Sequence, residues 1–219
     1  MALSREKVLD AALRLAGEHG LAGLSMRKLA ADVGVEAMSL YNHVANKGDL
    51  LDGLTARVFE SVPLPGPGPW DERLRALTHG LYTAFSRHPV VVRALATDAA
   101  NPRSAGSLKF IDATFSALLD AGLDERGAAR GYRSLIGLVF GAVLTETVGL
   151  SGVPDASNAS DVSDVERAEP VVAWFQRSVT ADALPSLHRA LPSLLDGDCL
   201  QDFEFQLDLV IGGLRASVR

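Results

Sequence analysis

Four side chains near the N-terminus occupy the early, outward part of a short predicted helix, residues 36–43, and have the chemistry to contact DNA bases. The amide of Asn42 can form paired hydrogen bonds with adenine, and Ala37 and Met38 can contact a thymine methyl group. Ser39 lies among them. Such side chains read a DNA sequence only when other elements hold their helix in the major groove.

The residues around this helix have the spacing of a helix-turn-helix. Ala30 is small where two helices approach, Gly34 tolerates the positive φ of a tight turn, and Leu40 is an apolar anchor under the second helix. In a helix-turn-helix the second helix lies in the major groove. The same string of residues is common in ordinary helical hairpins, so this pattern alone leaves both interpretations open.

Apolar residues recur at helical spacing along the chain, and the alternation typical of strands is nowhere sustained. Ser4, Ser25 and Asn46 are predicted N-caps of the first, second and fourth helices. Asp49 is placed to reach back to the last of these caps. Residues 151–164 are expected to form a loop. The predicted fold class is therefore all-α.

A proline-rich segment divides the chain. Residues 63–69 contain four prolines and two glycines among seven residues, so no helix is expected to cross them. We therefore expect an N-terminal helix-turn-helix domain, residues 1–62, then this linker, and a C-terminal helical domain, residues 70–219. Near the C-terminus, Pro185 and Pro192 are expected to break the helical pattern into pieces.

Composition and charge exclude several classes of protein. The 219 residues are 47% hydrophobic and 22% charged, which is typical of a globular chain. The net charge of −6 argues against a broad basic surface, so any contact with nucleic acid must be local. A single cysteine, a charged N-terminus and the lack of a long apolar run predict a cytoplasmic protein without a membrane span. No HExxH, GxSxG, P-loop or CxxC motif indicates an enzyme.

The run GLSMRKLAADVGVEAMSLYNHVANKGDLLDGL, residues 23–54, resembles the DNA-binding domain of the tetracycline-repressor (TetR) family of transcriptional regulators. The resemblance covers residues 4–60. It continues at residues 141–144 (GAVL) and 202–214 (DFEFQLDLVIGGL), which look like the C-terminal domain of the tetracycline-repressor subgroup. It implies a homodimer that binds double-stranded operator DNA, holds a small-molecule effector in its C-terminal helices and releases DNA when that effector binds.

The resemblance also implies which residues contact DNA. By this match Ala37, Met38 and Ser39 face the bases. Arg27 matches a position that reaches a base or a phosphate, and an arginine there can hold guanine O6 and N7 with both arms. Tyr41 matches a phosphate contact but also fits a plain half-buried aromatic. The implied phosphate contacts are Tyr41, His43 and Lys47.

In the family, the helix at residues 70–88 and the helix around Phe110 line the ligand cavity, although such an apolar stripe also fits an ordinary core. The tetracycline repressors bind a magnesium chelate through histidine and carboxylate. Here the region after Val90 lacks a histidine, and Thr145 stands where a glutamate would follow the GAVL segment. We therefore expect no metal, no cofactor and a largely apolar ligand. The candidate ligand-binding residues are Leu77, Leu81, Phe85, Leu95, Phe110 and Thr114.

Two predicted helices, residues 134–145 and 200–218, each have more apolar surface than one core face needs. Gly137 and Gly141 lie one turn apart and would let another helix approach closely. A four-helix interface between two copies of the chain is expected, and a central helix of a monomer is the alternative. The candidate interface residues are Leu135, Val139, Phe203, Leu207, Val210 and Leu214.

Two other functions stay open. One is a helical protein that binds or modifies a small molecule without reading DNA. The other is a DNA-binding protein that no ligand releases. A small-molecule-binding protein of the first kind would not bind the DNA that flanks the gene, whereas a regulator would. A DNA-binding protein of the second kind would bind that DNA, but no ligand would release it.

Overall fold

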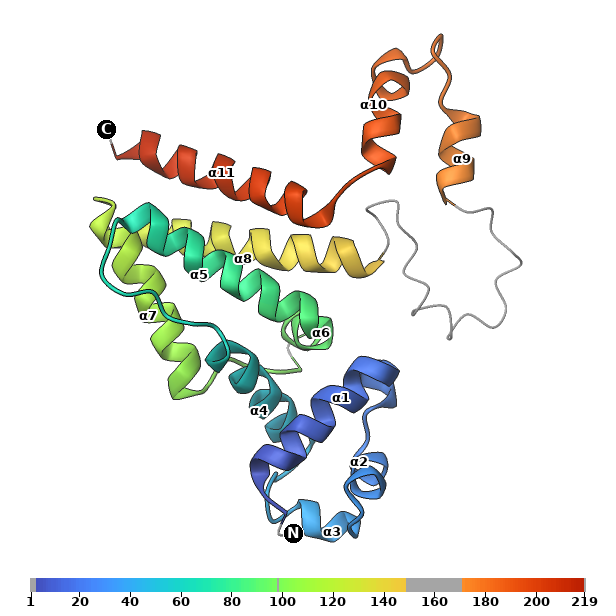
Figure 1. Ribbon diagram of the computed structural model, residues 1–219, viewed down its shortest axis with the longest axis vertical. Coiled ribbons are helices and arrows are strands. Elements are labelled where there is room, and N and C mark those ends of the chain that lie inside the picture. Colours follow the sequence, from blue (N-terminus) through green and yellow to red (C-terminus); the bar gives the residue numbers. More distant parts are fainter. Residues whose placement is uncertain (1–2, 98, 149–170, 219) are drawn as a thin grey trace.

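The computed structural model describes residues 3–97, 99–148 and 171–218. In these ranges every regular element is a helix, which confirms the all-α fold class, and the loop predicted at residues 151–164 lies outside them. The first three helices lie at one end and the C-terminal helices at the other, with the fourth running between them (Figure 1). The helices are α1 (Arg5–Gly23), α2 (Met26–Val33), α3 (Ala37–Leu40), α4 (Lys47–Glu60), α5 (Trp70–Arg87), α6 (Pro89–Ala96), α7 (Ala105–Asp120), α8 (Glu125–Val148), α9 (Val171–Ser178), α10 (Pro185–Leu195) and α11 (Cys199–Ser217).

Helices α1, α2 and α4 begin at the predicted caps. The side-chain oxygens of Ser4 and Ser25 accept hydrogen bonds from the backbone N–H groups three residues later, at 3.3 and 3.2 Å, and Asn46 does the same at 2.9 Å. Each cap satisfies a donor that a helix N-terminus leaves unpaired, which stabilises the helix by about 1 kcal/mol. Short-range polar contacts therefore set where these three helices start.

The turn between α2 and α3 has the predicted form. Gly34 adopts φ 72° and ψ 34°, a left-handed conformation that would strain any residue with a side chain. The N–H group of Val35 bonds to the carbonyl of Ala30 at 3.0 Å and closes the end of α2. Leu40 is fully buried. This turn and this anchor fix the direction in which α3 leaves α2.

Three helix boundaries differ from the sequence expectations. α3 covers only four residues, because the N–H groups of Tyr41 and His43 bond three residues back in the tighter pattern of a turn. The sequence places Gly20 just past the end of the first helix, and in the structure α1 kinks at Gly20, where φ is 65°, before it runs on to Gly23. Pro192 lies inside α10 rather than ending it, whereas Pro185 takes the first helical position, where a missing N–H is tolerated.

α4 shares a core with the C-terminal helices. The ring of Phe59, near the end of α4, meets Phe85 of α5 at a centroid distance of 5.6 Å and Phe110 of α7 at 5.4 Å. All three rings are buried, as is Val62 just after the helix. Each ring pair of this kind stabilises the folded chain by about 0.5–1.5 kcal/mol more than the burial of the two rings alone. The proline-rich segment at residues 63–69 therefore begins only after α4 has joined the C-terminal core.

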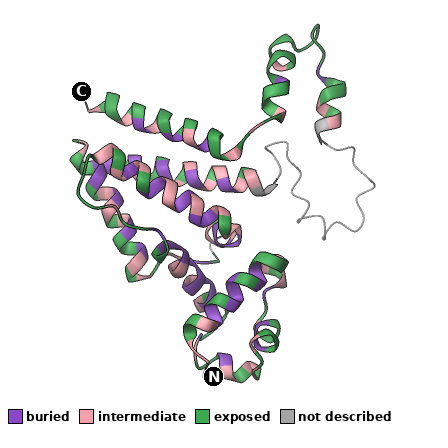
Figure 2. Cartoon of the chain, in the orientation of Figure 1, coloured by how far each residue is buried: buried purple, intermediate pink, exposed green. Residues whose placement is uncertain are grey.

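The C-terminal part is a bundle in which α5, α7 and α8 pack on one another and α11 lies along α8 (Figure 1). Arg75 of α5 pairs with Glu204 and Asp208 of α11, and an Arg215–Asp71 pair joins the same helices. Exposed pairs such as these contribute at most about 1 kcal/mol each, so the buried side chains hold the bundle. α9 and α10 project from it and are largely exposed (Figure 2).

Candidate DNA interface and effector site

The predicted reading helix, α3, lies at the opposite end of the molecule from α11 (Figure 1). Met38 is 73% exposed and Asn42 is exposed, whereas Ala37 and Ser39 are half-buried. Leu40 is turned inward and fully buried. A short helix that is anchored on one side and free on the other has the shape needed to enter a major groove.

The predicted phosphate contacts surround α3. Arg27 at the start of α2, Tyr41 after α3 and Lys47 at the start of α4 are exposed, and His43 is half-buried. The Lys47 ammonium donates to the carbonyl of Leu21 at 3.2 Å and has further protons to offer to an anion. The N-terminal helices therefore hold all the predicted DNA-contacting residues in one region.

Arg5, which the sequence analysis did not single out, connects the ends of α1, α3 and α4. It donates to both oxygens of the Asp49 carboxylate, at 3.1 and 2.8 Å, and to the His43 carbonyl at 2.5 Å. The Asp49 carboxylate also accepts a hydrogen bond from the backbone N–H of Ala45 at 2.8 Å. The sequence predicts that Asp49 reaches back to the cap residue Asn46, and it instead bonds to the residue before it. The hydrogen bonds from Arg5 hold the pKa of Asp49 below its ordinary value. Arg5 and Asp49 are 44 residues apart, so no local spacing signals their contact.

Two further ion pairs join the N-terminal helices. Arg14 of α1 pairs with Asp32 of α2 at 2.5 Å, and Arg57 of α4 pairs with Asp10 of α1 at 2.8 Å. The hydrogen bond that the Arg14 guanidinium donates to the Asp32 carboxylate is the main cause of a raised pKa of Arg14. Because these pairs are largely exposed, they orient the helices more than they stabilise them.

The predicted ligand-binding residues lie in the packed core of the C-terminal helices. All are buried except Leu95, which is half-buried. The Thr114 hydroxyl donates to the Phe110 carbonyl at 2.9 Å, and the Phe59 ring packs against both Phe85 and Phe110. A ligand that used these residues would have to move packed side chains. The six predicted ligand-binding residues are Leu77, Leu81, Phe85, Leu95, Phe110 and Thr114.

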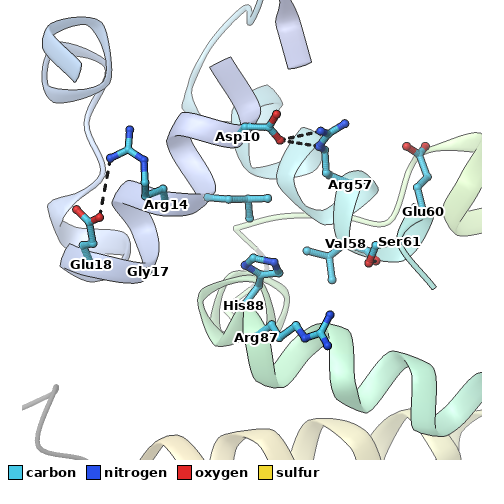
Figure 3. Close-up of a pocket in the computed structure, with 11 residues that line it drawn as sticks. Asp10, Arg14, Gly17, Glu18, Arg57, Val58, Glu60, Ser61, Arg87 and His88 are labelled. Carbon is cyan, nitrogen blue, oxygen red and sulfur yellow. Dashed lines mark hydrogen bonds and ion pairs between the residues drawn. The ribbon is translucent and has the colours of Figure 1, made fainter. Parts of the chain in front are cut away.

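An open hollow of about 700 Å³ lies at the junction of the two parts of the chain (Figure 3). It is lined by α1, α4 and the turn between α5 and α6, where Arg87 and His88 lie. Burial and the charge of Arg87 lower the pKa of His88, which favours the neutral ring at pH 7. None of the predicted ligand-binding residues lines this hollow. Sequence reasoning missed Arg87 and His88 because both lie off the apolar stripe of α5.

The predicted interface residues of α8 and α11 mostly face inward. Leu135 and Val139 of α8 and Phe203 and Leu207 of α11 are buried in the core of the chain itself, and the Phe203 ring stacks on Tyr82 with a centroid distance of 4.0 Å. These four predicted interface residues are therefore corrected to core residues of the single chain, while the dimer itself stays a prediction. The other two predicted residues, Val210 and Leu214, are half-buried.

The outward side of α11 also carries apolar side chains. Phe205 and Leu209 are 65% and 60% exposed. On α8, Gly137 and Gly141 are exposed, and a side chain added at either would meet nothing within 4 Å. The exposed apolar side chains of α11 therefore lie on a different face from Phe203 and Leu207.

The described part of the chain offers no group of three or more His, Cys, Asp or Glu side chains that could hold a metal ion. In those same ranges no helix is long and apolar enough to cross a membrane. The one cysteine, Cys199, is a half-buried free thiol at the start of α11. The principal features are therefore an exposed short helix at one end and an apolar helical interior at the other.

Both parts match known families. Residues 8–54 match the model for bacterial regulatory proteins of the tetR family, and residues 62–218 match that for the tetracyclin repressor-like C-terminal domain. The tetracycline repressor protein class C of Escherichia coli is 30% identical over 97% of this chain and 90% of its own length.

Solved structures from Streptomyces coelicolor share the fold. A possible TetR family transcriptional regulator is 30% identical with a TM-score of 0.77, covering 98% of this chain and 100% of its own. ActR in complex with actinorhodin is 26% identical with a TM-score of 0.79, covering 100% of this chain and 99% of its own. The chain therefore belongs to the TetR family of ligand-responsive, DNA-binding transcriptional regulators.

Proposed function

We propose that this chain is a repressor that binds a two-half-site operator as a homodimer and leaves it when a small, largely apolar molecule binds its C-terminal helices. The observation that carries the proposal is α3, where Met38 and Asn42 are exposed while Leu40 anchors the helix from below. The protein acts by binding alone, without a catalytic step, in the cytoplasm where operator DNA is reached. In this proposal the DNA-binding domain is residues 1–62, and the domain that binds the effector and the second copy is residues 70–219. The two are joined by a linker, residues 63–69.

Few polar side chains are available to read bases. Arg27 and Asn42 supply the hydrogen bonds, and Ala37 and Met38 supply apolar contacts to thymine methyl groups. Ser39, half-buried on α3, contacts the neighbouring base edge. Because the chain has a net charge of −6, phosphate binding depends on a small number of groups. Those groups are Tyr41, His43 and Lys47.

Two observations support a dimer. An operator with two half-sites needs two copies of the reading helix α3, and α11 has exposed apolar side chains that a second copy could cover. One copy of α3 covers one half-site, and two copies bind together only when their separation matches a whole number of DNA turns. Phe205 and Leu209 give each copy an exposed apolar surface. Gly137 and Gly141 leave room for close approach of a partner helix. We place these residues in a four-helix interface built from α8 and α11 of both copies.

The effector acts through α4. A molecule that enters beside Phe85 and Phe110 displaces the Phe59 ring and with it the end of the helix that carries the reader. The separation of the two readers then no longer fits the operator. An effector that prefers this displaced state by about 3 kcal/mol weakens DNA binding roughly 150-fold. The structure of ActR in complex with actinorhodin supports the binding of a small molecule by this chain as well.

A gel shift on the DNA that flanks the gene tests the proposal. We expect a retarded band that unlabelled flanking DNA competes away and unrelated DNA does not. Cell extracts or candidate apolar compounds should reverse it. A protein without DNA recognition gives no specific band, and a ligand-insensitive DNA binder gives a band that no compound reverses.

A further inference from the structure

A polar group outside the predicted ligand-binding set lies between α5 and α8. The carboxylate of Glu146 is within hydrogen-bond reach of two donors on α5, the phenol of Tyr82 at 3.4 Å and the hydroxyl of Ser86 at 3.2 Å. Both bonds go to the same oxygen, Oε2. Tyr82 and Ser86 are one helical turn apart, so α5 presents both hydroxyl groups on one face.

This group lies at the edge of the apolar core, where Tyr82 is buried and Ser86 and Glu146 are half-buried. Tyr82 is only 5% exposed, and its ring stacks on Phe203 of α11 with planes 9° apart. Burial and the nearby Glu146 charge raise the pKa of Tyr82 to about 12, so the phenol stays a hydrogen-bond donor at neutral pH. Val143, one turn before Glu146 on the same side of α8, is fully buried, so an apolar side chain adjoins the carboxylate.

Glu146 differs from the other carboxylates that join these helices. Asp71, Asp120 and Glu204 are each paired with an arginine. Among the side chains that the structure describes, no lysine, arginine or histidine forms an ion pair with Glu146. Two neutral hydroxyl groups supply hydrogen bonds but no positive charge. A half-buried carboxylate with only neutral partners is a favourable site for a cation.

We propose that Glu146, Tyr82 and Ser86 form the polar end of the effector site, and that the effector is an apolar molecule carrying a cationic amine. This inference rests on the proposed function, in which the C-terminal helices bind the effector. The ammonium group binds the Glu146 carboxylate, which two hydroxyl groups hold in position. The apolar body of the effector packs against the core beside Phe85 and Val143.

The test compares two probes that differ only in charge, naphthylmethylamine, which is an ammonium ion at pH 7, and the neutral naphthylmethanol. Their dissociation constants for the full-length protein are measured by isothermal titration calorimetry. The variant is Glu146→Gln, which keeps the shape and the hydrogen-bond acceptor but removes the charge. The matched control is Glu72→Gln, which removes the same charge from an exposed position on α5.

We expect the amine to bind the wild-type protein about tenfold more tightly than the alcohol. The preference should disappear in Glu146→Gln and persist in Glu72→Gln. Equal binding of the two probes, no binding of the amine, or a preference that survives Glu146→Gln would overturn the proposal. A gel shift with the same preparations reports operator binding separately, so a wrong effector class and a wrong regulatory function give different results.

Discussion

Phe59 at the end of α4 packs its ring at 89° to the ring of Phe85 in α5, with centroids 5.6 Å apart. α4 also begins at Lys47, directly after the region that contacts DNA in the proposed complex. One helix therefore connects the reader to the centre of the C-terminal core. In the proposed mechanism, a displacement at Phe85 would reach α3 through packed side chains rather than through the proline-rich segment.

Replacing Phe59 should weaken the whole chain. Phe59→Ala leaves a cavity between α4, α5 and α7 and is expected to lower the free energy of unfolding by about 3–5 kcal/mol. Leu108→Ala on the exposed side of α7 is the control and should change it by less than about 0.5 kcal/mol. Urea denaturation at fixed protein concentration measures both. A loss below about 1 kcal/mol for Phe59→Ala would show that α4 is not held by this core.

The Arg5–Asp49 contact should make stability depend on acid pH. The folded pKa of Asp49 lies below its ordinary value of 3.8, so this contact contributes fully above that value and is lost as the pH falls through the folded pKa. Asp49→Asn keeps an acceptor for the Ala45 N–H but removes the charge. We expect it to cost on the order of 1 kcal/mol at pH 6, because the pair is partly exposed.

The difference between wild type and Asp49→Asn should shrink in urea titrations as the pH is lowered from 6 to about 3. Arg5→Lys, which keeps a positive charge without the two-pronged contact, should lose part of the same stability. A difference that stays constant over this pH range would contradict the assignment of the Asp49 charge to the contact.

A substitution at Arg27 tests whether this side chain contacts a base or a phosphate. If its guanidinium holds a guanine, Arg27→Ala should cost about 1–3 kcal/mol and relax the preference at one base pair in each half-site. Arg103→Ala removes the same charge from an exposed position before α7 and should leave the preference intact. Fluorescence anisotropy on operators substituted one base pair at a time measures this. An equal loss on every sequence would assign Arg27 to phosphate.

The two sides of α11 should respond differently to a charge. Leu209→Asp places a carboxylate on the exposed face and should give a folded monomer that no longer binds a two-half-site operator. Leu207→Asp buries a carboxylate inside the chain and should cost several kcal/mol of folding stability. Leu64→Asp, at an exposed position in the linker, is the control. Light scattering after gel filtration gives the mass, and a dimer that persists in Leu209→Asp would place the interface elsewhere.

Local sequence signals predicted the N-terminal part well, because its determinants are short-range. The Ser25 cap and the Gly34 turn each depend on residues a few positions away. Pairings across the fold carried no such signal, and the Arg5–Asp49 contact is the clearest example.

Periodicity also cannot tell which side of a helix with two apolar faces meets its own chain. Phe203 and Leu207 therefore appeared as interface residues although they belong to the core, while Phe205 and Leu209 went unnoticed. Glu146 was missed for a related reason, since its partners on α5 are 60 and 64 residues away in the chain.

The most direct test of the central claim is selection of binding sites from a pool of random double-stranded DNA. The full-length protein should enrich a two-fold symmetric sequence whose half-sites are centred about one helical turn, or a multiple of it, apart. Met38→Lys, which replaces an exposed apolar reader with a cation, should change the enriched bases at the same position in both half-sites. Enrichment of no sequence, or of the same sequence by both proteins, would contradict the claim that α3 of a dimer reads an operator.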